Sequence, residues 1–117
     1  MSNPITIYHN PRCSKSRQTL KLIEDAGIQP EIVLYLETPP NKTQIETLLR
    51  QLNIAPRDLL RKGEEEYKNL GLKDLSLSDE ALIDAMVKHP RLIERPIVTR
   101  DEKAVLGRPP ENVETLL

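Results

Sequence analysis

Two short segments rich in β-branched residues flank a helical segment near the start of the chain, and this order limits the possible folds most strongly. Residues 5–8, Ile-Thr-Ile-Tyr, predict one strand, and residues 31–35, Glu-Ile-Val-Leu-Tyr, predict a second. Between them, apolar residues recur near helical spacing as far as Ala26, and Gly27, a residue typical of helix ends, follows. Strand, helix and strand in this order predict a βαβ unit.

The rest of the chain predicts helices first and a hairpin last. After a break at residues 38–41, four helical segments are expected, at residues 42–52, 57–60, 64–70 and 79–88. Residues 97–99 and 104–106 predict a closing hairpin, and a short helix is expected from about Glu111. This order predicts an α/β, thioredoxin-like fold: a small mixed sheet flanked by helices, with a helical insertion between its two halves.

Length and charge narrow the class of protein. The chain has 117 residues, which suits one domain with a single core, so we expect residues 1–117 to form one domain. Lys and Arg number 17 and Asp and Glu number 18, for a formal net charge of −1. This balance argues against nucleic acid or an anionic membrane as the main partner. An anion site would therefore need local clustering of positive charge.

Several features favour the cytoplasm. No apolar run approaches the roughly 20 residues that span a bilayer. The first residues, Met1-Ser2-Asn3-Pro4, show no basic region followed by an apolar stretch, so we expect no signal peptide. Cys13 is the only cysteine, and a single cysteine forms no internal disulfide. A reducing compartment, and hence a cytoplasmic protein, is the natural interpretation.

Residues 9–17, His-Asn-Pro-Arg-Cys-Ser-Lys-Ser-Arg, form the most informative segment. Cys13 lies where the first predicted strand passes to the first predicted helix. Helix N-termini present free N–H groups and partial positive charge, both of which favour a reactive thiolate. The same backbone donors can hold a tetrahedral oxyanion. The segment therefore predicts a nucleophilic cysteine beside an oxyanion site, although a buried structural cysteine is the alternative.

Other kinds of cysteine site fit the spacing poorly. We expect no metal, because the chain has one cysteine and two histidines, His9 and His89, without a ligand pair at metal spacing. Ser16 stands where a C-x-x-C dithiol would need its second cysteine. A cysteine phosphatase loop needs five residues between Cys and Arg, whereas three separate Cys13 from Arg17.

Other candidate residues have a functional and a structural interpretation. His9 either ends the first strand or lends positive charge to the cysteine, and Ser16 could simply cap the helix. Three arginines, Arg61, Arg95 and Arg108, lie at the edges of apolar or turn segments, where a guanidinium can be aimed at an oxyanion. Spacing alone favours ordinary solvated arginines at all three positions.

Several motifs in order resemble the glutaredoxin-coupled arsenate reductases over essentially the whole chain. The matching stretches are residues 5–11 with Cys13 and Ser16-Arg17, residues 34–37 with Pro39-Pro40, residues 59–62, His89-Pro90, residues 95–98 and residues 107–109. The resemblance implies a thioredoxin-like fold with a helical insertion. It also implies reduction of arsenate to arsenite by a cysteine nucleophile.

The resemblance assigns roles to individual residues. Cys13 matches the nucleophile, His9 matches the residue thought to favour its thiolate, and Pro96 matches a structural cis-proline. The family's anion-binding arginines match Arg61, Arg95 and Arg108, and we expect Ser16 and Arg17, in the nucleophile motif, to contribute to substrate binding.

The resemblance also implies how electrons reach the substrate. The thiolate attacks arsenate to form a thioarsenate, glutathione displaces arsenic as arsenite, and glutaredoxin resolves the mixed disulfide. Glutathione is thus a co-substrate, glutaredoxin a partner, and no cofactor is expected to stay bound. The single cysteine agrees with this chemistry, because the remaining reducing thiols must then come from outside the chain. One departure is that Ser14-Lys15 stands where well-characterised members have Gly-Thr.

Two other functions remain open from the sequence. One is a related thiol oxidoreductase that acts on another oxyanion or on a mixed disulfide. The other is a non-enzymatic regulator of transcription of the Spx type, which shares the fold and binds RNA polymerase. Many Spx-type proteins carry C-x-x-C at the loop and lack the full set of arginines, which disfavours that alternative here.

Overall fold

The computed structural model describes residues 4–117. Residues 1–3, which carry most of the segment on which we expect no signal peptide, lie outside the described residues. The chain divides into two units, which we call the sheet unit (Met1–Thr38 with Arg95–Leu117) and the helical unit (Pro39–Glu94). That residues 1–117 form a single domain stays a prediction.

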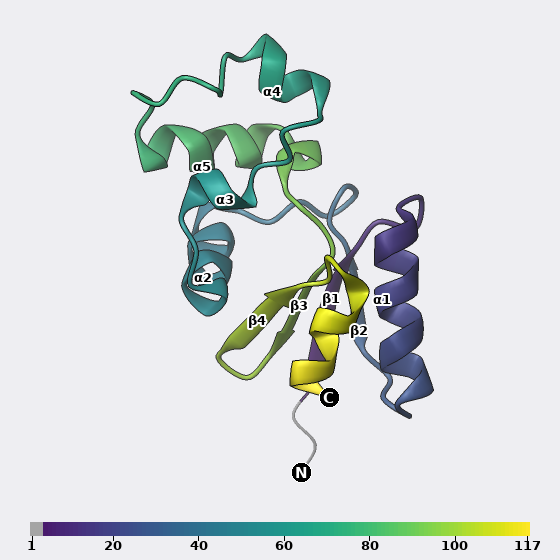
Figure 1. The fold of residues 1–117 in the computed structure, drawn as a ribbon. Helices are drawn as coiled ribbons and strands as arrows, with labels where there is room; N and C mark the ends of the chain where they lie inside the picture. The colour runs from purple at the N-terminus through teal and green to yellow at the C-terminus, as the bar shows by residue number, and fades with distance from the viewer. Residues whose placement is uncertain (1–3) are drawn as a thin grey trace. The chain divides into compact units, whose positions relative to one another are not determined.

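The sheet unit contains the predicted βαβ segment and the closing hairpin. Its four-stranded sheet has the order β2-β1-β3-β4, in which β1 pairs parallel with β2 and antiparallel with β3, and β3 pairs antiparallel with β4. This arrangement confirms the predicted small mixed sheet (Figure 1). The strands and the long helix are β1 (Ile5–His9), α1 (Ser14–Asp25), β2 (Glu31–Leu34), β3 (Ile97–Arg100) and β4 (Lys103–Leu106).

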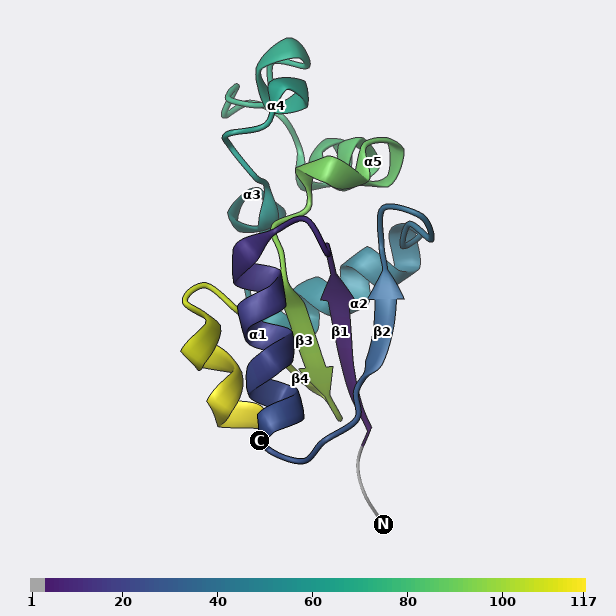
Figure 2. The same ribbon diagram turned by 90° about the vertical axis from the view of Figure 1, so that its right-hand side faces the viewer.

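The core of the sheet unit forms where α1 and a C-terminal 3₁₀ helix, η2 (Pro110–Leu116), lie side by side against one face of the sheet (Figure 2). Alternate residues of β1 face this core, as the strand period of two requires. Burial of each such aliphatic side chain stabilises the fold by about 1.5–3 kcal/mol. The buried cluster consists of Ile5, Ile7, Ile23, Val98, Val113 and Leu116.

Gly107, which follows β4, allows a close approach between this segment and α1. A Cβ atom at this position would meet Thr19 Oγ1 and would lie 2.8 Å from Pro96 Cγ. The Gly107 N–H donates to the Pro96 carbonyl at 2.9 Å, and Thr19 Oγ1 donates to the Lys15 carbonyl at 2.8 Å. The absence of a side chain at Gly107 therefore lets the segments around Gly107 and Pro96 pack closely against α1 near Thr19.

The helical unit is built around α5, which packs against α2, α3 and η1, while α4 contacts η1. The facing side chains Ile45, Leu48, Leu82 and Met86 are buried, as the helical periodicity predicts. The elements of this unit are α2 (Lys42–Leu52), α3 (Pro56–Leu59), α4 (Glu65–Asn69), α5 (Asp79–Lys88) and η1 (Pro90–Leu92).

The two longest helices of this unit begin at side-chain caps. Asn41 and Gln44 form a capping box, in which each side chain accepts from the other residue's backbone N–H at 2.8 Å. Ser78 Oγ accepts from the Ala81 N–H at 3.1 Å. These bonds satisfy donors that a helix start would otherwise leave exposed, and thereby fix where α2 and α5 begin.

The differences from the predicted elements are small and have local causes. The helix α1 begins at Ser14, directly after Cys13, and its first turn is polar and lacks apolar periodicity. Pro56 belongs to α3 and Pro90 to η1, because proline suits the first position of a helix. The predicted C-terminal helix is a 3₁₀ helix. In the part of the chain that the structure describes, every helix is too short or too polar to cross a bilayer.

Candidate functional site

Cys13 is the N-cap residue of α1, with φ −94° and ψ 122°. Its N–H donates to the Asn10 carbonyl and its own carbonyl accepts from the Arg17 N–H, both at 3.0 Å. In contrast to α2 and α5, α1 starts without a side-chain cap hydrogen bond. The partly exposed thiol thus lies at a helix terminus whose first N–H groups have no side-chain cap, a suitable place for an anion.

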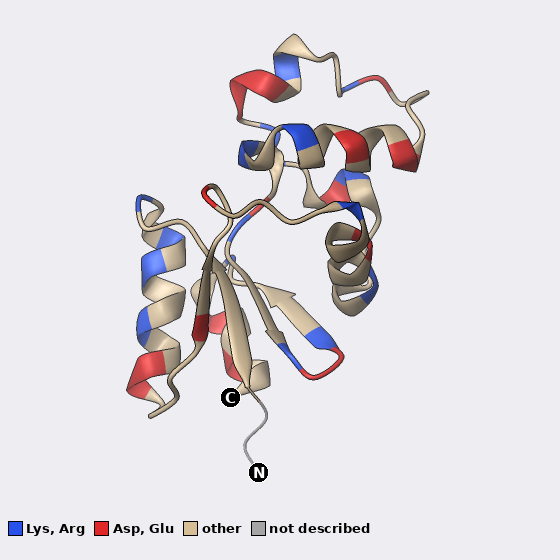
Figure 3. Cartoon of the chain, turned by 180° about the vertical axis from the view of Figure 1, so that it is seen from behind, with Lys and Arg blue, Asp and Glu red and all other residues tan. Residues whose placement is uncertain are grey.

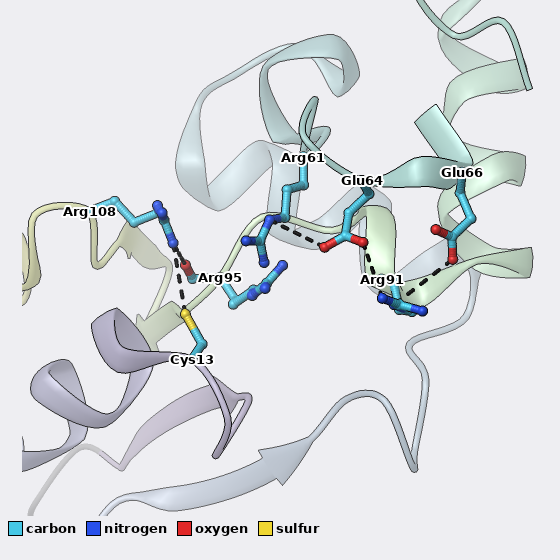
Figure 4. A network of polar contacts seen from close by, with 7 residues as sticks. All are labelled: Cys13, Arg61, Glu64, Glu66, Arg91, Arg95 and Arg108. Atoms are coloured by element: carbon cyan, nitrogen blue, oxygen red, sulfur yellow. Dashed lines mark hydrogen bonds and ion pairs between the residues drawn. The ribbon is translucent and has the colours of Figure 1, made fainter. Parts of the chain in front are cut away.

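Arg108 lies beside the cysteine sulfur (Figure 4). Its Nη1 atom is 3.9 Å from Cys13 Sγ and also donates to the Arg95 carbonyl at 3.2 Å. The bond to the carbonyl holds the guanidinium in place. A guanidinium beside a sulfur attracts the negative charge of a thiolate, or of an oxyanion bonded to that sulfur.

Arg95 and Pro96 lie in the segment that leads into β3. The Arg95 side chain is buried, with 8% of the residue exposed, and its carbonyl receives the bond from Arg108. The Arg95–Pro96 peptide bond is cis, the isomer that the family resemblance assigns to this position. The Arg108–Pro109 bond is cis as well, which the sequence analysis did not anticipate.

His9, at the end of β1, lies inside the protein and contacts the first turns of α1. Its Nδ1 atom is 2.6 Å from Ser16 Oγ, which also accepts from the Asn10 N–H at 3.1 Å. Burial, and next the charge of Arg17, lower the pKa of His9 below its ordinary value of 6.5, against a smaller opposite effect of Glu24. A lowered pKa favours the neutral form of His9, and its expected role as a positive neighbour of Cys13 stays a prediction.

Ser16 and Arg17 hold the loop in this structure. Ser16 is fully buried and bonded to His9 and Asn10, and the Arg17 guanidinium donates to the Pro11 carbonyl at 2.8 Å. Their expected contacts with substrate stay a prediction.

Asn10 is the residue of this loop whose role the sequence analysis missed. Its carbonyl accepts from the Cys13 N–H, its side-chain oxygen accepts from the Arg12 N–H at 3.0 Å, and its own N–H donates to Ser16. The Asn-Pro dipeptide, a common turn signal, could have identified it.

Basic residues outnumber acidic ones beside Cys13 and along α1, although the chain is nearly neutral (Figure 3). Arg12 immediately precedes Cys13, and Lys15 and Arg17 lie in the first turn of α1, whereas Lys21 lies further along and pairs with Asp25 at 3.2 Å. The acidic residues of this helix are confined to its last two positions. The local charge expected for an anion site is therefore present in this part of the chain.

Arg61 belongs to the helical unit. Its Nε atom pairs with Glu64 Oε1 at 3.4 Å. Its Nη1 atom is buried and has no hydrogen-bond partner among residues 4–117. The same residues include no cluster of three His, Cys, Asp or Glu side chains that could hold a metal ion.

Comparisons with known proteins agree with the predicted family. The model of the ArsC family matches residues 8–116. An Escherichia coli K12 protein, YfgD, is 54% identical over 97% of this chain and 96% of its own length, and its name states no activity. An arsenate reductase of Escherichia coli is 49% identical over 100% of this chain and 82% of its own length.

A solved structure gives the same result for the fold. The arsenate reductase from Vibrio cholerae superimposes with a TM-score of 0.97 and 49% identity, and the match covers 100% of both chains. Together with the four-stranded mixed sheet, this likeness confirms the predicted thioredoxin-like fold.

Proposed function

The chain belongs to the ArsC family, and on that premise we propose that it is a cytoplasmic oxidoreductase that reduces arsenate to arsenite. The nucleophile is Cys13, and the reducing equivalents come from glutathione and glutaredoxin. The observation that carries this proposal is the Cys13 thiol at the N-terminus of α1, 3.9 Å from the Arg108 guanidinium. Helix terminus and guanidinium both favour a negative charge at this sulfur and on whatever bonds to it.

The reaction proceeds in three exchanges. The Cys13 thiolate attacks arsenic, an arsenate oxygen leaves as water after protonation, and a sulfur–arsenic bond forms. A glutathione thiolate then attacks the Cys13 sulfur, and the electron pair of the broken bond stays on arsenic, which leaves as arsenite. A glutaredoxin thiolate attacks the glutathione sulfur of the mixed disulfide and releases Cys13. The two electrons thus come from two external thiols, as a chain with one cysteine requires.

The remaining residues bind or position in this proposal. Charge-assisted hydrogen bonds to the oxyanion oxygens come from Arg95, Arg108 and Arg61. Arg17 adds positive charge beside the loop that carries Cys13. Ser16 contributes through the shape of the loop that it helps to hold. A neutral His9 orients Ser16 rather than supplying charge.

A second candidate is the same thiol chemistry on another oxyanion. Ser14-Lys15 after the nucleophile departs from the Gly-Thr of well-characterised members, and Lys15 adds an exposed charge there. Ser14 itself is accommodated, because it is the first helical residue of α1 and is absent from the described non-glycine residues with positive φ. Lys15 is therefore the residue through which the choice of oxyanion would differ from that of the well-characterised members.

Arsenate-dependent oxidation of NADPH tests the proposed function. Purified protein, glutathione, glutaredoxin and glutathione reductase are combined, and arsenate is added last. We expect oxidation that depends on both arsenate and this protein, with the Escherichia coli arsenate reductase as the positive control. No oxidation while the control is active would refute arsenate reduction, and slower Cys13 alkylation in the presence of another oxyanion would then favour the second candidate.

The lowered pKa of His9 predicts how stability depends on pH. Unfolded His9 gains a proton near pH 6.5, whereas the folded protein binds it only at lower pH. The unfolded state therefore binds more protons in that window, and the free energy of unfolding should fall as pH drops below about 6.5 and level off below the folded-state pKa. Urea unfolding between pH 5 and 7.5 should show this fall in the wild-type protein and a smaller one in His9→Asn. Equal slopes for the wild-type protein and His9→Asn would contradict the expected contribution of His9 to the pH dependence of stability.

A further inference from the structure

A buried nitrogen of Arg61 lacks an explanation within the helical unit. Its Nη1 atom has no hydrogen-bond partner among residues 4–117, although the side chain as a whole is 29% exposed. Buried donors of charged groups are almost always bonded, so this donor needs an acceptor from outside the chain, such as a water or an anion. An oxyanion would supply the missing acceptor.

Backbone pairing fixes the position of Arg61. Leu60 forms an antiparallel bridge with Ile93, and the Arg61 N–H donates to the Leu92 carbonyl at 2.7 Å. The Glu94 N–H donates to the Leu59 carbonyl at 2.8 Å on the other side of the bridge. This pairing brings η1, which precedes Ile93, next to the segment that carries Arg61.

Glu64 lies between two arginines as a result (Figure 4). Its Oε1 atom is 3.4 Å from Arg61 Nε, and its Oε2 atom is 3.4 Å from Arg91 Nη2. Arg91 Nε also lies 4.0 Å from Glu66 Oε2. The Glu64 side chain is only 14% exposed, so solvent screens these pairs less than an ordinary surface pair.

We propose that Glu64 is a positioning residue that holds the Nε side of Arg61, so that the buried Nη1 stays available to an oxyanion, and that Arg91 in turn holds Glu64. This inference rests on the proposed anion-binding role of Arg61. A carboxylate beside Arg61 alone would offset the charge that attracts an anion. Arg91 reduces this offset, because it pairs with the other Glu64 oxygen, although Glu66 lies near Arg91 Nε as well.

Direct binding of arsenate, measured by calorimetry without glutathione, tests the inference separately from turnover. Glu64→Ala should weaken binding by about 3- to 10-fold, the range of coupling between contacting charged groups. Glu64→Gln should fall between Glu64→Ala and the wild type, because it keeps a polar oxygen near Arg61 Nε but loses the negative charge of the ion pair. In an Arg61→Ala background, Glu64→Ala should add nothing, since the residue that it positions is absent.

The matched control is Glu80→Gln, which breaks the exposed ion pair with Lys42 in the same helical unit and should leave affinity unchanged. Thermal melts accompany each variant. The inference would be overturned if Glu64→Ala or Arg61→Ala kept wild-type affinity for arsenate. It would also be overturned if Glu64→Ala still weakened binding in the Arg61→Ala background, or if the wild-type protein bound no arsenate. Binding that follows the expected pattern without arsenate reduction would support the inference and refute the proposed function.

Discussion

Replacing Cys13 by serine should abolish arsenate reduction. The hydroxyl is a far weaker nucleophile than a thiolate, and this chain has no second cysteine that could take over. We expect the arsenate-dependent rate to fall at least about 1,000-fold, to the background of glutathione alone, as in other enzymes that lose a covalent nucleophile. The measurement is coupled NADPH oxidation over a range of arsenate concentrations.

The same variant separates loss of chemistry from loss of structure. Cys13 is partly exposed and its backbone makes the loop hydrogen bonds, so Cys13→Ser should keep the melting temperature within a few degrees. Mass spectrometry of the wild-type protein after turnover without glutaredoxin should find one glutathione on Cys13, and the variant should carry none. Appreciable arsenate turnover by a folded Cys13→Ser protein would contradict the mechanism.

Local sequence patterns predicted the elements of the sheet unit well. The two β-branched runs and the residues around 97–106 become β1, β2, β3 and β4, because short apolar and β-branched runs favour strands, and in β1 alternate residues are also buried. The helix between them was also predicted, with Gly27 just after its end. The polar first turn, which places Cys13 at the helix terminus, carries no periodic signal.

Contacts between distant parts of the chain were harder to predict. The bridge between Leu60 and Ile93, and with it the placement of Arg91 beside Glu64, depends on how separate segments pair rather than on either segment alone. Nothing in the few residues around Glu64 distinguishes it from an ordinary surface carboxylate. Such positions become visible only when the fold brings the two segments together.

The candidate site likewise combines local features that the sequence predicted with distant contacts that it did not. The chemistry around Cys13 was apparent locally, because a cysteine among basic residues at a helix start is unusual for a structural thiol. Arg108 is 95 positions away from Cys13, and spacing alone gave no reason to prefer it to other arginines. The family resemblance selected Arg108, and the structure places its guanidinium beside the sulfur. For His9 the resemblance suggested a charged neighbour, whereas burial lowers its pKa and favours the neutral form.

Replacing Arg108 by alanine should produce the second large loss of activity. Arg108 is the guanidinium found next to Cys13 Sγ, so in the proposed reaction it stabilises both the attacking thiolate and the oxyanion bonded to it. Removal of one such donor typically lowers kcat by about 10²–10³-fold, or about 2.7–4 kcal/mol. We expect a loss of this size in kcat/KM for arsenate, measured by coupled NADPH oxidation. The rate of Cys13 alkylation at low salt should fall as well.

Two further variants decide whether the guanidinium or its charge alone is responsible. Arg108→Lys keeps the positive charge but loses the planar guanidinium, whose Nη1 contacts both the Arg95 carbonyl and the sulfur, so it should recover only part of the activity. Arg50→Ala, which removes an exposed arginine of α2 that bonds to Thr47 one turn away, should retain wild-type kcat/KM. If Arg108→Ala behaves like Arg50→Ala, the contact with Cys13 has no part in catalysis. If Arg108→Lys equals the wild type, a point charge near the sulfur is sufficient, and oriented donation to the oxyanion is excluded.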